Sequence, residues 1–219
     1  VLVMSRALDT VSTGLKTGRS VSGSVEFISR LIETAKQMKN ACITADMLRD
    51  ASDRVSASLK DKLLDVANVL EVYWGLLSSD VKDPEDRLTR LAEILPDSSF
   101  GDGGHIWIDG FDDFTGQQYM VIEKLIEKDC DMTVCLTWDG SLDREHVFSK
   151  QRKAFSIISD MAKRRGTVCR IEHMGASMAG RPEELRFLEE QLFSADTPVF
   201  EGETERIKVT ACGDPIEEC

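Results

Sequence analysis

A change of pattern at the glycine pair 103–104 constrains the fold more than any other feature of the sequence. Before that pair, apolar residues recur every three or four positions, which is the spacing of one face of an α-helix. Three segments show it, at residues 25–38, 59–77 and 84–95. The third is preceded by Asp83 and opens with Pro84, favoured residues at the N-cap and first position of a helix. We therefore predict an all-helical domain over residues 1–100.

After the glycine pair, short runs rich in β-branched residues alternate with segments of helical spacing. The runs span residues 105–109, 132–137, 167–172 and 206–211, and the helical segments span residues 115–128, 147–165 and 182–193. Such alternation is typical of βαβ units. We predict an α/β domain over residues 101–219, with a parallel sheet that carries helices on both faces.

The charge of the chain limits its partners. The 219 residues carry a net charge of −12, whereas attraction to phosphate comes from clustered Lys and Arg. The chain is therefore expected to bind nucleic acid poorly by itself. No apolar run approaches the roughly 20 residues that a membrane span needs, so we predict no membrane contact.

The two ends of the sequence add two expectations. Residue 1 is Val, without the basic and apolar stretch of a signal peptide, which favours the cytoplasm over secretion. Residues 214–219 have the pattern of a helix start, with Asp214 as N-cap and Pro215 at the first position. A helix that begins so close to the last residue suggests a fragment of a longer protein.

The six cysteines do not predict a metal site. None of them forms a C-x-x-C pair, and the three histidines are scattered. Zinc and iron–sulfur sites have closer ligand spacing. Several of these cysteines lie in apolar stretches, where a reduced Cys behaves as a small hydrophobic residue.

The densest polar cluster follows the first predicted strand. Asp109 stands at the strand end, and Gly110, Asp112, Asp113 and Gln118 come directly after it. Ligands of parallel sheets bind beyond the carboxyl ends of the strands, and a phosphoryl-transfer site uses a strand-end Asp to hold Mg²⁺. Asp and Gly are equally typical of a simple turn. Both interpretations remain open on these residues alone.

The phosphate loop of such a site is missing from the sequence. No segment of the 219 residues matches G-x-x-x-x-G-K-[ST], the pattern whose backbone amides cradle phosphates. We therefore expect no nucleotide cofactor to bind this chain by itself.

A basic run, Lys163-Arg164-Arg165, ends the helix predicted at 147–165. These side chains are candidates for weak contact with DNA phosphates. A solvated helix face with cations at its C-terminus explains the run more simply.

The polar cluster also resembles a known family. Residues 106–111, Ile-Trp-Ile-Asp-Gly-Phe, followed by Phe114-Thr115 and Gln118-Tyr119, are similar to the degenerate motif II of the B subunit of bacterial AddAB-type helicase–nucleases. Four further segments agree with that family in order and spacing. They are residues 83–96, 132–138, 185–193 and 207–218.

The resemblance implies roles for individual residues. Asp109 matches the helicase Asp that holds Mg²⁺, and Gln118 falls where the motif ends in Gln. Gly110 stands where an active motor has Glu, the group that orients the attacking water. Residues 137–141 lack the Gln of the motor's next motif. The motor chemistry is therefore expected to be vestigial, and the isolated chain is expected to be catalytically inert.

The resemblance also implies the wider context. It predicts a helicase-like core that lacks its first strand and Walker A loop, with a helical subdomain inserted before motif II. The full-length subunit would pair with an A subunit as a heterodimer, contact single-stranded DNA and process double-strand breaks for recombinational repair. ATP, Mg²⁺ and an iron–sulfur cluster are expected only for that full-length subunit or its complex.

Two alternatives remain on the sequence. The chain could be an active superfamily 1 helicase ATPase domain that is truncated at its N-terminus, which Gly110 disfavours. It could also be a free-standing α/β module that binds Mg²⁺, which the hundred-residue helical segment disfavours.

Overall fold

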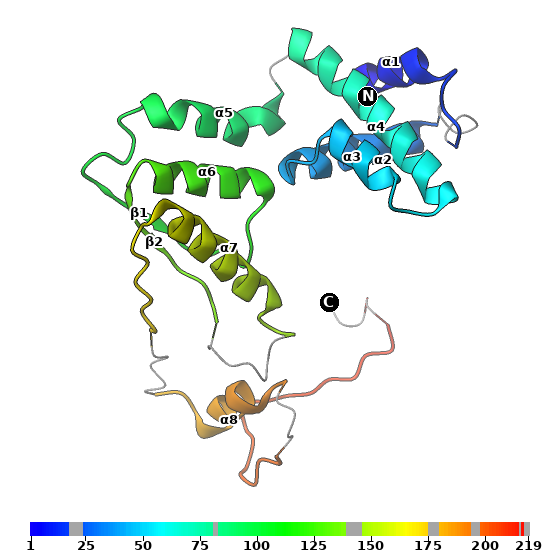
Figure 1. Ribbon diagram of the computed structural model, residues 1–219. Helices are drawn as coiled ribbons and strands as arrows, with labels where there is room; N and C mark the ends of the chain where they lie inside the picture. Colours follow the sequence, from blue (N-terminus) through cyan, green and yellow to red (C-terminus); the bar gives the residue numbers. More distant parts are fainter. Residues whose placement is uncertain are drawn as a thin grey trace.

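The computed structural model of the chain describes residues 1–17, 24–80, 83–138, 146–174, 180–193, 198–214 and 216. Four helices form an N-terminal helical block (Figure 1): α1 (Leu2–Val11), α2 (Val25–Asn40), α3 (Ala45–Ser52) and α4 (Ala57–Asp80). Their apolar faces share one core, in which Met4 and Leu70 are fully buried. The helices predicted at 25–38 and 59–77 are confirmed as α2 and α4. α3 was not predicted, although Thr44 caps it by accepting a hydrogen bond from Met47 N.

The helix predicted at 84–95 is divided into three pieces. A 3₁₀ turn, η1 (Pro84–Asp86), leads into α5 (Arg87–Ile94), and a second turn, η2 (Leu95–Asp97), contains Pro96. Asp83 caps the first turn through its side chain, as expected. α5 packs against α6 (Gly116–Glu127) of the neighbouring βαβ unit. The domain boundary predicted at residue 100 stays a prediction.

The second region is built on one βαβ unit. Strands β1 (His105–Ile108) and β2 (Asp131–Val134) are joined through α6 and pair in parallel, with His105 opposite Asp131 and Ile108 opposite Val134. This pairing confirms the predicted parallel arrangement of the first two strands. Helix α7 (Ser149–Arg165) packs against α6. The fold is therefore α/β, rich in helix, with a small parallel sheet.

The third and fourth predicted strands are wrong. Residues 167–172 and 206–211 form no strand in the structure, and Val168 and Val209 are 92% and 93% exposed. β-branched residues favour a strand only where a neighbouring strand can accept the backbone hydrogen bonds and bury the side chains. Among the described residues the sheet has two strands, and neither segment reaches it.

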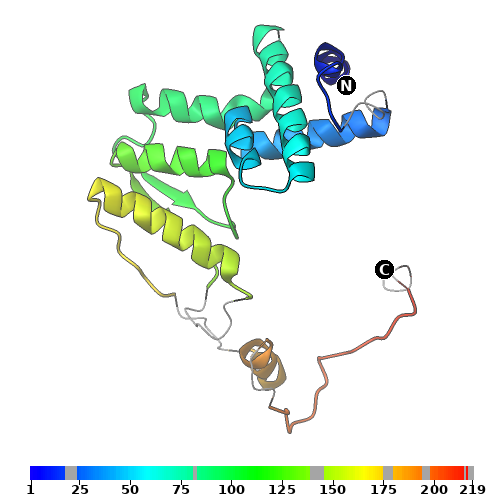
Figure 2. The ribbon, with the colours of Figure 1, turned by 45° about the vertical axis from the view of Figure 1, so that its right-hand side comes forward.

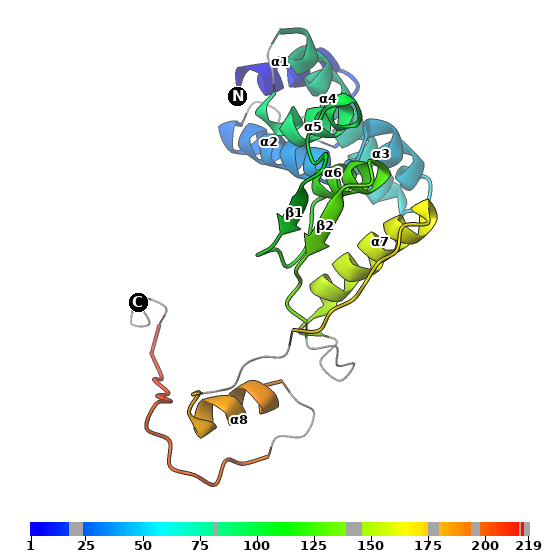
Figure 3. The same cartoon turned by 90° about the vertical axis from the view of Figure 1, so that its left-hand side faces the viewer.

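The predicted covering of both sheet faces is also wrong. On one face, Ile108, Met132 and Val134 pack with α6 and α7, and Figure 3 shows these two helices on the same side of the strands. The opposite face carries Trp107, which is 70% exposed, and His105, whose ring lies 4.5 Å from that of Trp107. No helix among the described residues covers this second face. The helices of residues 1–80 share a core of their own, and α2 also contacts α6 and η1.

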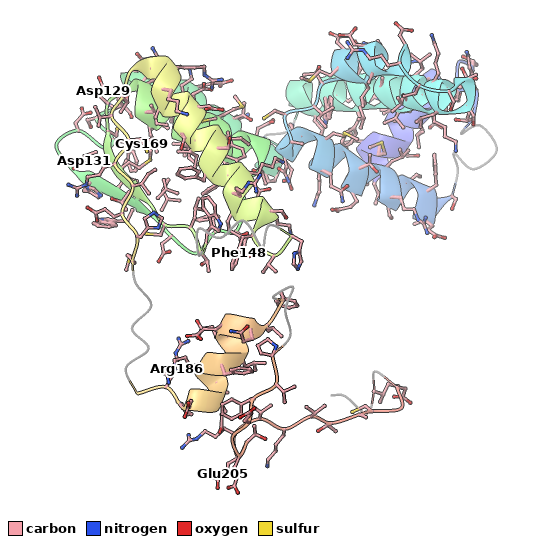
Figure 4. The ribbon with its side chains drawn as sticks, turned by 60° about the horizontal axis from the view of Figure 1, so that its bottom comes forward. Asp129, Asp131, Phe148, Cys169, Arg186 and Glu205 are labelled. Atoms are coloured by element: carbon pink, nitrogen blue, oxygen red, sulfur yellow. The ribbon has the colours of Figure 1, made fainter. Side chains whose placement is uncertain are left out.

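Beyond α7 none of the described residues is buried. Helix α8 (Glu183–Gln191) has no buried residue, and Figure 4 shows it, with Arg186, apart from the other helices. The helix start predicted at residues 214–219 lies mostly outside the described residues, although Asp214 Oδ1 accepts a hydrogen bond of 2.8 Å from Ile216 N. Within the described ranges every helix is too short or too polar to cross a bilayer.

Candidate functional site

Asp109 follows β1 directly and starts a tight turn. Its Oδ1 accepts a hydrogen bond of 2.8 Å from Gly110 N, and its side chain is exposed at the carboxyl end of the strand. Gly110 has a φ of +80°, in the left-handed region that glycine adopts without strain. The strand-end position predicted for Asp109 is therefore confirmed, and the residue after it is held in a conformation that other residues rarely adopt.

Asp113 is used to fasten the loop to α6. Its Oδ1 accepts hydrogen bonds of 2.8 Å from Phe114 N and from the Tyr119 hydroxyl. Burial, together with the hydrogen bond to Asp113, raises the pKa of Tyr119 well above its usual value. Phe114 is buried and stacks on Phe111 at 5.0 Å between ring centroids. The loop is thus packed onto the helix that follows it.

Asp112 and Gln118 also have partners within the chain. Asp112 Oδ1 accepts a hydrogen bond of 2.9 Å from Nε2 of Gln151, a buried residue in the first turn of α7. Gln118 forms a capping box with Thr115 at the start of α6, and its Oε1 accepts 2.8 Å from Thr115 N. Asp112 therefore holds the loop against α7, and Gln118 holds its end at the start of α6.

The three carboxylates of the loop do not converge. Asp112 bonds toward α7, Asp113 bonds toward α6, and Asp109 closes its own turn. Among the described residues no three His, Cys, Asp or Glu side chains are grouped closely enough to hold a metal ion. The arrangement makes a well-fastened connection between a strand and a helix.

The basic run at the end of α7 faces acidic side chains. Arg164 lies 3.1 Å from Glu123 and Arg165 lies 2.9 Å from Glu127, both on α6. Lys163 lies 3.5 Å from Asp160 on its own helix. A hydrogen bond donated by Lys124 and the charge of Arg165 lower the pKa of the Glu127 carboxyl. The run helps to hold α7 on α6, and its contact with DNA stays a prediction.

Sequence reasoning missed Gln117, which is 2% exposed. Its Nε2 donates to Glu85 O at 2.8 Å and to Thr89 Oγ1 at 3.0 Å, so it joins α6 to the start of α5. A Gln beside another Gln in the first turn of a helix gives no sequence signal of burial.

Comparison with known proteins places the chain in a family. The family model described as "ADDB, N-terminal" matches residues 1–189. A protein of Caldanaerobacter subterraneus subsp. tengcongensis, named as the B subunit of an ATP-dependent helicase/deoxyribonuclease, is 30% identical over 95% of this chain and 19% of its own length. Proteins of the same name from Geobacillus thermodenitrificans and Clostridium novyi are 32% and 24% identical, over 83% and 100% of this chain and 17% and 20% of their own lengths.

This chain thus spans about a fifth of each of these relatives. The segment that resembles motif II runs from β1 into the start of α6 and lies within the matched residues. The chain therefore belongs to the AddB N-terminal family.

Proposed function

We propose that this chain is the N-terminal, helicase-like part of the B subunit of an ATP-dependent helicase/deoxyribonuclease. Membership of the AddB N-terminal family and the names of the relatives support this assignment. In the proposed complex, a cytoplasmic heterodimer with an A subunit, the enzyme processes DNA double-strand breaks for recombinational repair.

The helicase-like part acts as an inactivated scaffold. The observation that carries this proposal is the left-handed turn at Gly110, which follows the one carboxylate that matches a motor residue. An active motor needs a Glu at this position to orient water. Here the position holds a glycine with no side chain, so the attacking water would have no partner. The same observation disfavours the alternative of an active ATPase domain.

The loop residues do not fit a magnesium–nucleotide site. Asp112 bonds toward α7, Asp113 bonds toward α6, and Gln118 bonds to Thr115. Asp109 is the one loop carboxylate directly at the strand end, and it closes its own turn. The chain also lacks a phosphate-loop sequence. We expect ATP, Mg²⁺ and an iron–sulfur cluster only for the full-length subunit or its complex.

The experiment that tests inactivation is Asp109→Ala in the full-length B subunit, in complex with the A subunit. ATP hydrolysis and DNA unwinding should stay within about twofold of the unchanged complex, because Asp109 is not part of a working motor. The positive control is a complex whose A-subunit motor is inactivated, which should lose unwinding. A loss of turnover with Asp109→Ala would instead support an active ATPase here. Residues 1–219 alone should hydrolyse no ATP above a buffer control.

Contact with single-stranded DNA through Lys163, Arg164 and Arg165 is proposed to be weak. Each of these cations already faces a carboxylate, and the chain carries a net charge of −12. Binding of an oligonucleotide to residues 1–219 should therefore be weak at physiological salt. A sub-micromolar affinity with a steep salt dependence would contradict this expectation.

A further inference from the structure

The end of α2 and the start of α6 meet at a contact that has no spare room. Figures 1 and 2 show the two helix ends side by side. A β-carbon added to Gly116 would lie 2.7 Å from the carbonyl carbon and oxygen of Ala41. Real β-carbons essentially never approach other atoms so closely. Gly116 is therefore needed for the close approach of two backbones.

The chain reversal after α2 is shaped to meet α6. Ile43 N donates to Met38 O at 2.8 Å and Cys42 N donates to Lys39 O at 2.9 Å, which is the bonding pattern of a Schellman C-cap. Cys42 takes the left-handed position, with a φ of 58°, where glycine is usual. Its Sγ lies 3.2 Å from Sδ of Met120 on α6.

A third element is tied to the same place by Gln117. The two hydrogen bonds of its Nε2 go to Glu85 O and Thr89 Oγ1. One side chain of α6 therefore holds both η1 and the first turn of α5. Because Gln117 is buried, its loss would remove a donor shared by both acceptors.

Two ion pairs also link α2 to the residues around η1. Lys39 Nζ lies 2.6 Å from carboxylate oxygens of both Asp83 and Asp86, and its side chain is 20% exposed. Burial lowers the pKa of Lys39, but the hydrogen bonds to the two carboxylates outweigh it and raise the pKa overall. Thus α2, η1, α5 and α6 are joined through backbone packing, a buried amide and a shielded charge.

We propose that this junction is a rigid coupling between the helical block and the loop that carries Asp109. The loop, residues 109–115, lies between β1 and α6, so the sheet fixes one of its ends and the junction fixes the other. A displacement of α2 is passed through Gly116 and Gln117 to the start of α6 and hence to the loop. The coupling does not depend on whether the loop supports ATP hydrolysis.

Hydrogen exchange of the full-length B subunit, measured by mass spectrometry, tests the coupling. Gly116→Ala should speed exchange by about tenfold or more in residues 38–43, 109–115 and 116–120 together, because overpacking forces the two helix ends apart. Exchange in residues 4–8 and 66–70, inside the helical block, should stay unchanged. Gly75→Ala is the matched control, since a β-carbon there has nothing within 4 Å.

If Gly116→Ala also speeds exchange in residues 4–8 and 66–70, it has loosened the helical block as a whole. A second, milder variant then tests the coupling. Gln117→Ala removes the donor without adding atoms, and it should speed exchange in the same three segments by about threefold. Faster exchange in residues 116–120 with residues 38–43 unchanged would overturn the proposal in either variant. A Gly116→Ala protein that behaves like Gly75→Ala would overturn it as well.

Discussion

The helical block and the two-stranded sheet differ in how much of their apolar surface they bury. In the block, Met4 and Leu70 are fully buried among neighbouring helices. In the sheet, Ile108 packs against helices while Trp107, the residue before it, is 70% exposed. A helix forms its backbone hydrogen bonds within itself, whereas a strand depends on a neighbouring strand to form them. The comparison teaches that nearby segments suffice to complete a helical core and that a sheet depends on more distant ones.

The largest expected effect tests whether the block is a true core. Leu70→Ala should lower the free energy of unfolding by about 3 kcal/mol, because it leaves a cavity at a fully buried position. Leu188→Ala on α8, where the side chain is 39% exposed, should cost less than about 1 kcal/mol. Urea unfolding followed by circular dichroism measures both. Equal losses would remove the distinction between the core and the open C-terminal region.

A buried aspartate on α4 gives a second test within the helical block. Asp65 is 7% exposed and accepts hydrogen bonds from Lys16 N at 3.0 Å, and from Thr17 N and Oγ1 at 2.7 Å. Asp65→Ala should cost about 2 kcal/mol, because these donors lose a buried acceptor. The same unfolding measurement checks it. Asp61→Ala, which breaks an exposed pair with Lys16, is the control and should change little.

The junction between the two regions should respond to pH. Burial raises the pKa of Asp83, but hydrogen bonds from Lys39 and the Glu85 backbone lower it overall, below 3.8. The stability from Asp83 is therefore present above pH 3.8 and is lost as the pH falls through the lower folded value. The raised pKa of Lys39 preserves its contribution below pH 10.5, and this is lost as the pH rises through the folded value.

Asp83→Asn should accordingly cost about 1–2 kcal/mol between about pH 5 and 9. The difference from the unchanged chain should shrink in more acidic solution, where Asp83 is protonated in both states of the unchanged chain. Unfolding midpoints measured from strongly acidic solution up to about pH 9 provide the check. Glu26→Gln, in an exposed pair with Arg30, should have little effect at any pH, and a matching profile for both variants would contradict the role of the junction.

The smallest expected effect concerns the uncovered sheet face. Trp107→Ala should change the free energy of unfolding by less than about 0.5 kcal/mol, because the indole is mostly in water. Ile122→Ala, at a 2% exposed position on the covered side, should cost about 2–4 kcal/mol. A large loss with Trp107→Ala would show that the face is covered in solution.

The sequence predicted helices well because their information is local. The periodicity at 59–77 marks most of α4 (Ala57–Asp80), and the segment predicted at 115–128 contains α6 with its cap Thr115. The eight-residue helix α3 is too short to show a clear period. The strand predictions at 167–172 and 206–211 failed because β-branched residues favour a strand only beside another strand. Composition does not say whether such a neighbour lies within reach.

The candidate site was predicted only in part. The place of Asp109 at a strand end follows from the local pattern and was confirmed. The partners of Asp112 and Gln117 were not foreseen, because Gln151 lies 39 residues along the chain and Glu85 lies 32 residues back. Residue spacing within one segment carries no information about such distant hydrogen bonds.

The turn at Gly110 has a consequence for which residues this position can accept. No atom lies within 4 Å of a β-carbon added there, so space alone would permit the Glu of an active motor. The backbone, however, holds a φ of +80°, which costs an L-residue roughly 1–2 kcal/mol. A Gly110→Glu variant would therefore find room for its side chain while straining the backbone that carries it. Installing a carboxylate here changes the shape of the turn as well as its chemistry, so the position and the conformation cannot be altered separately.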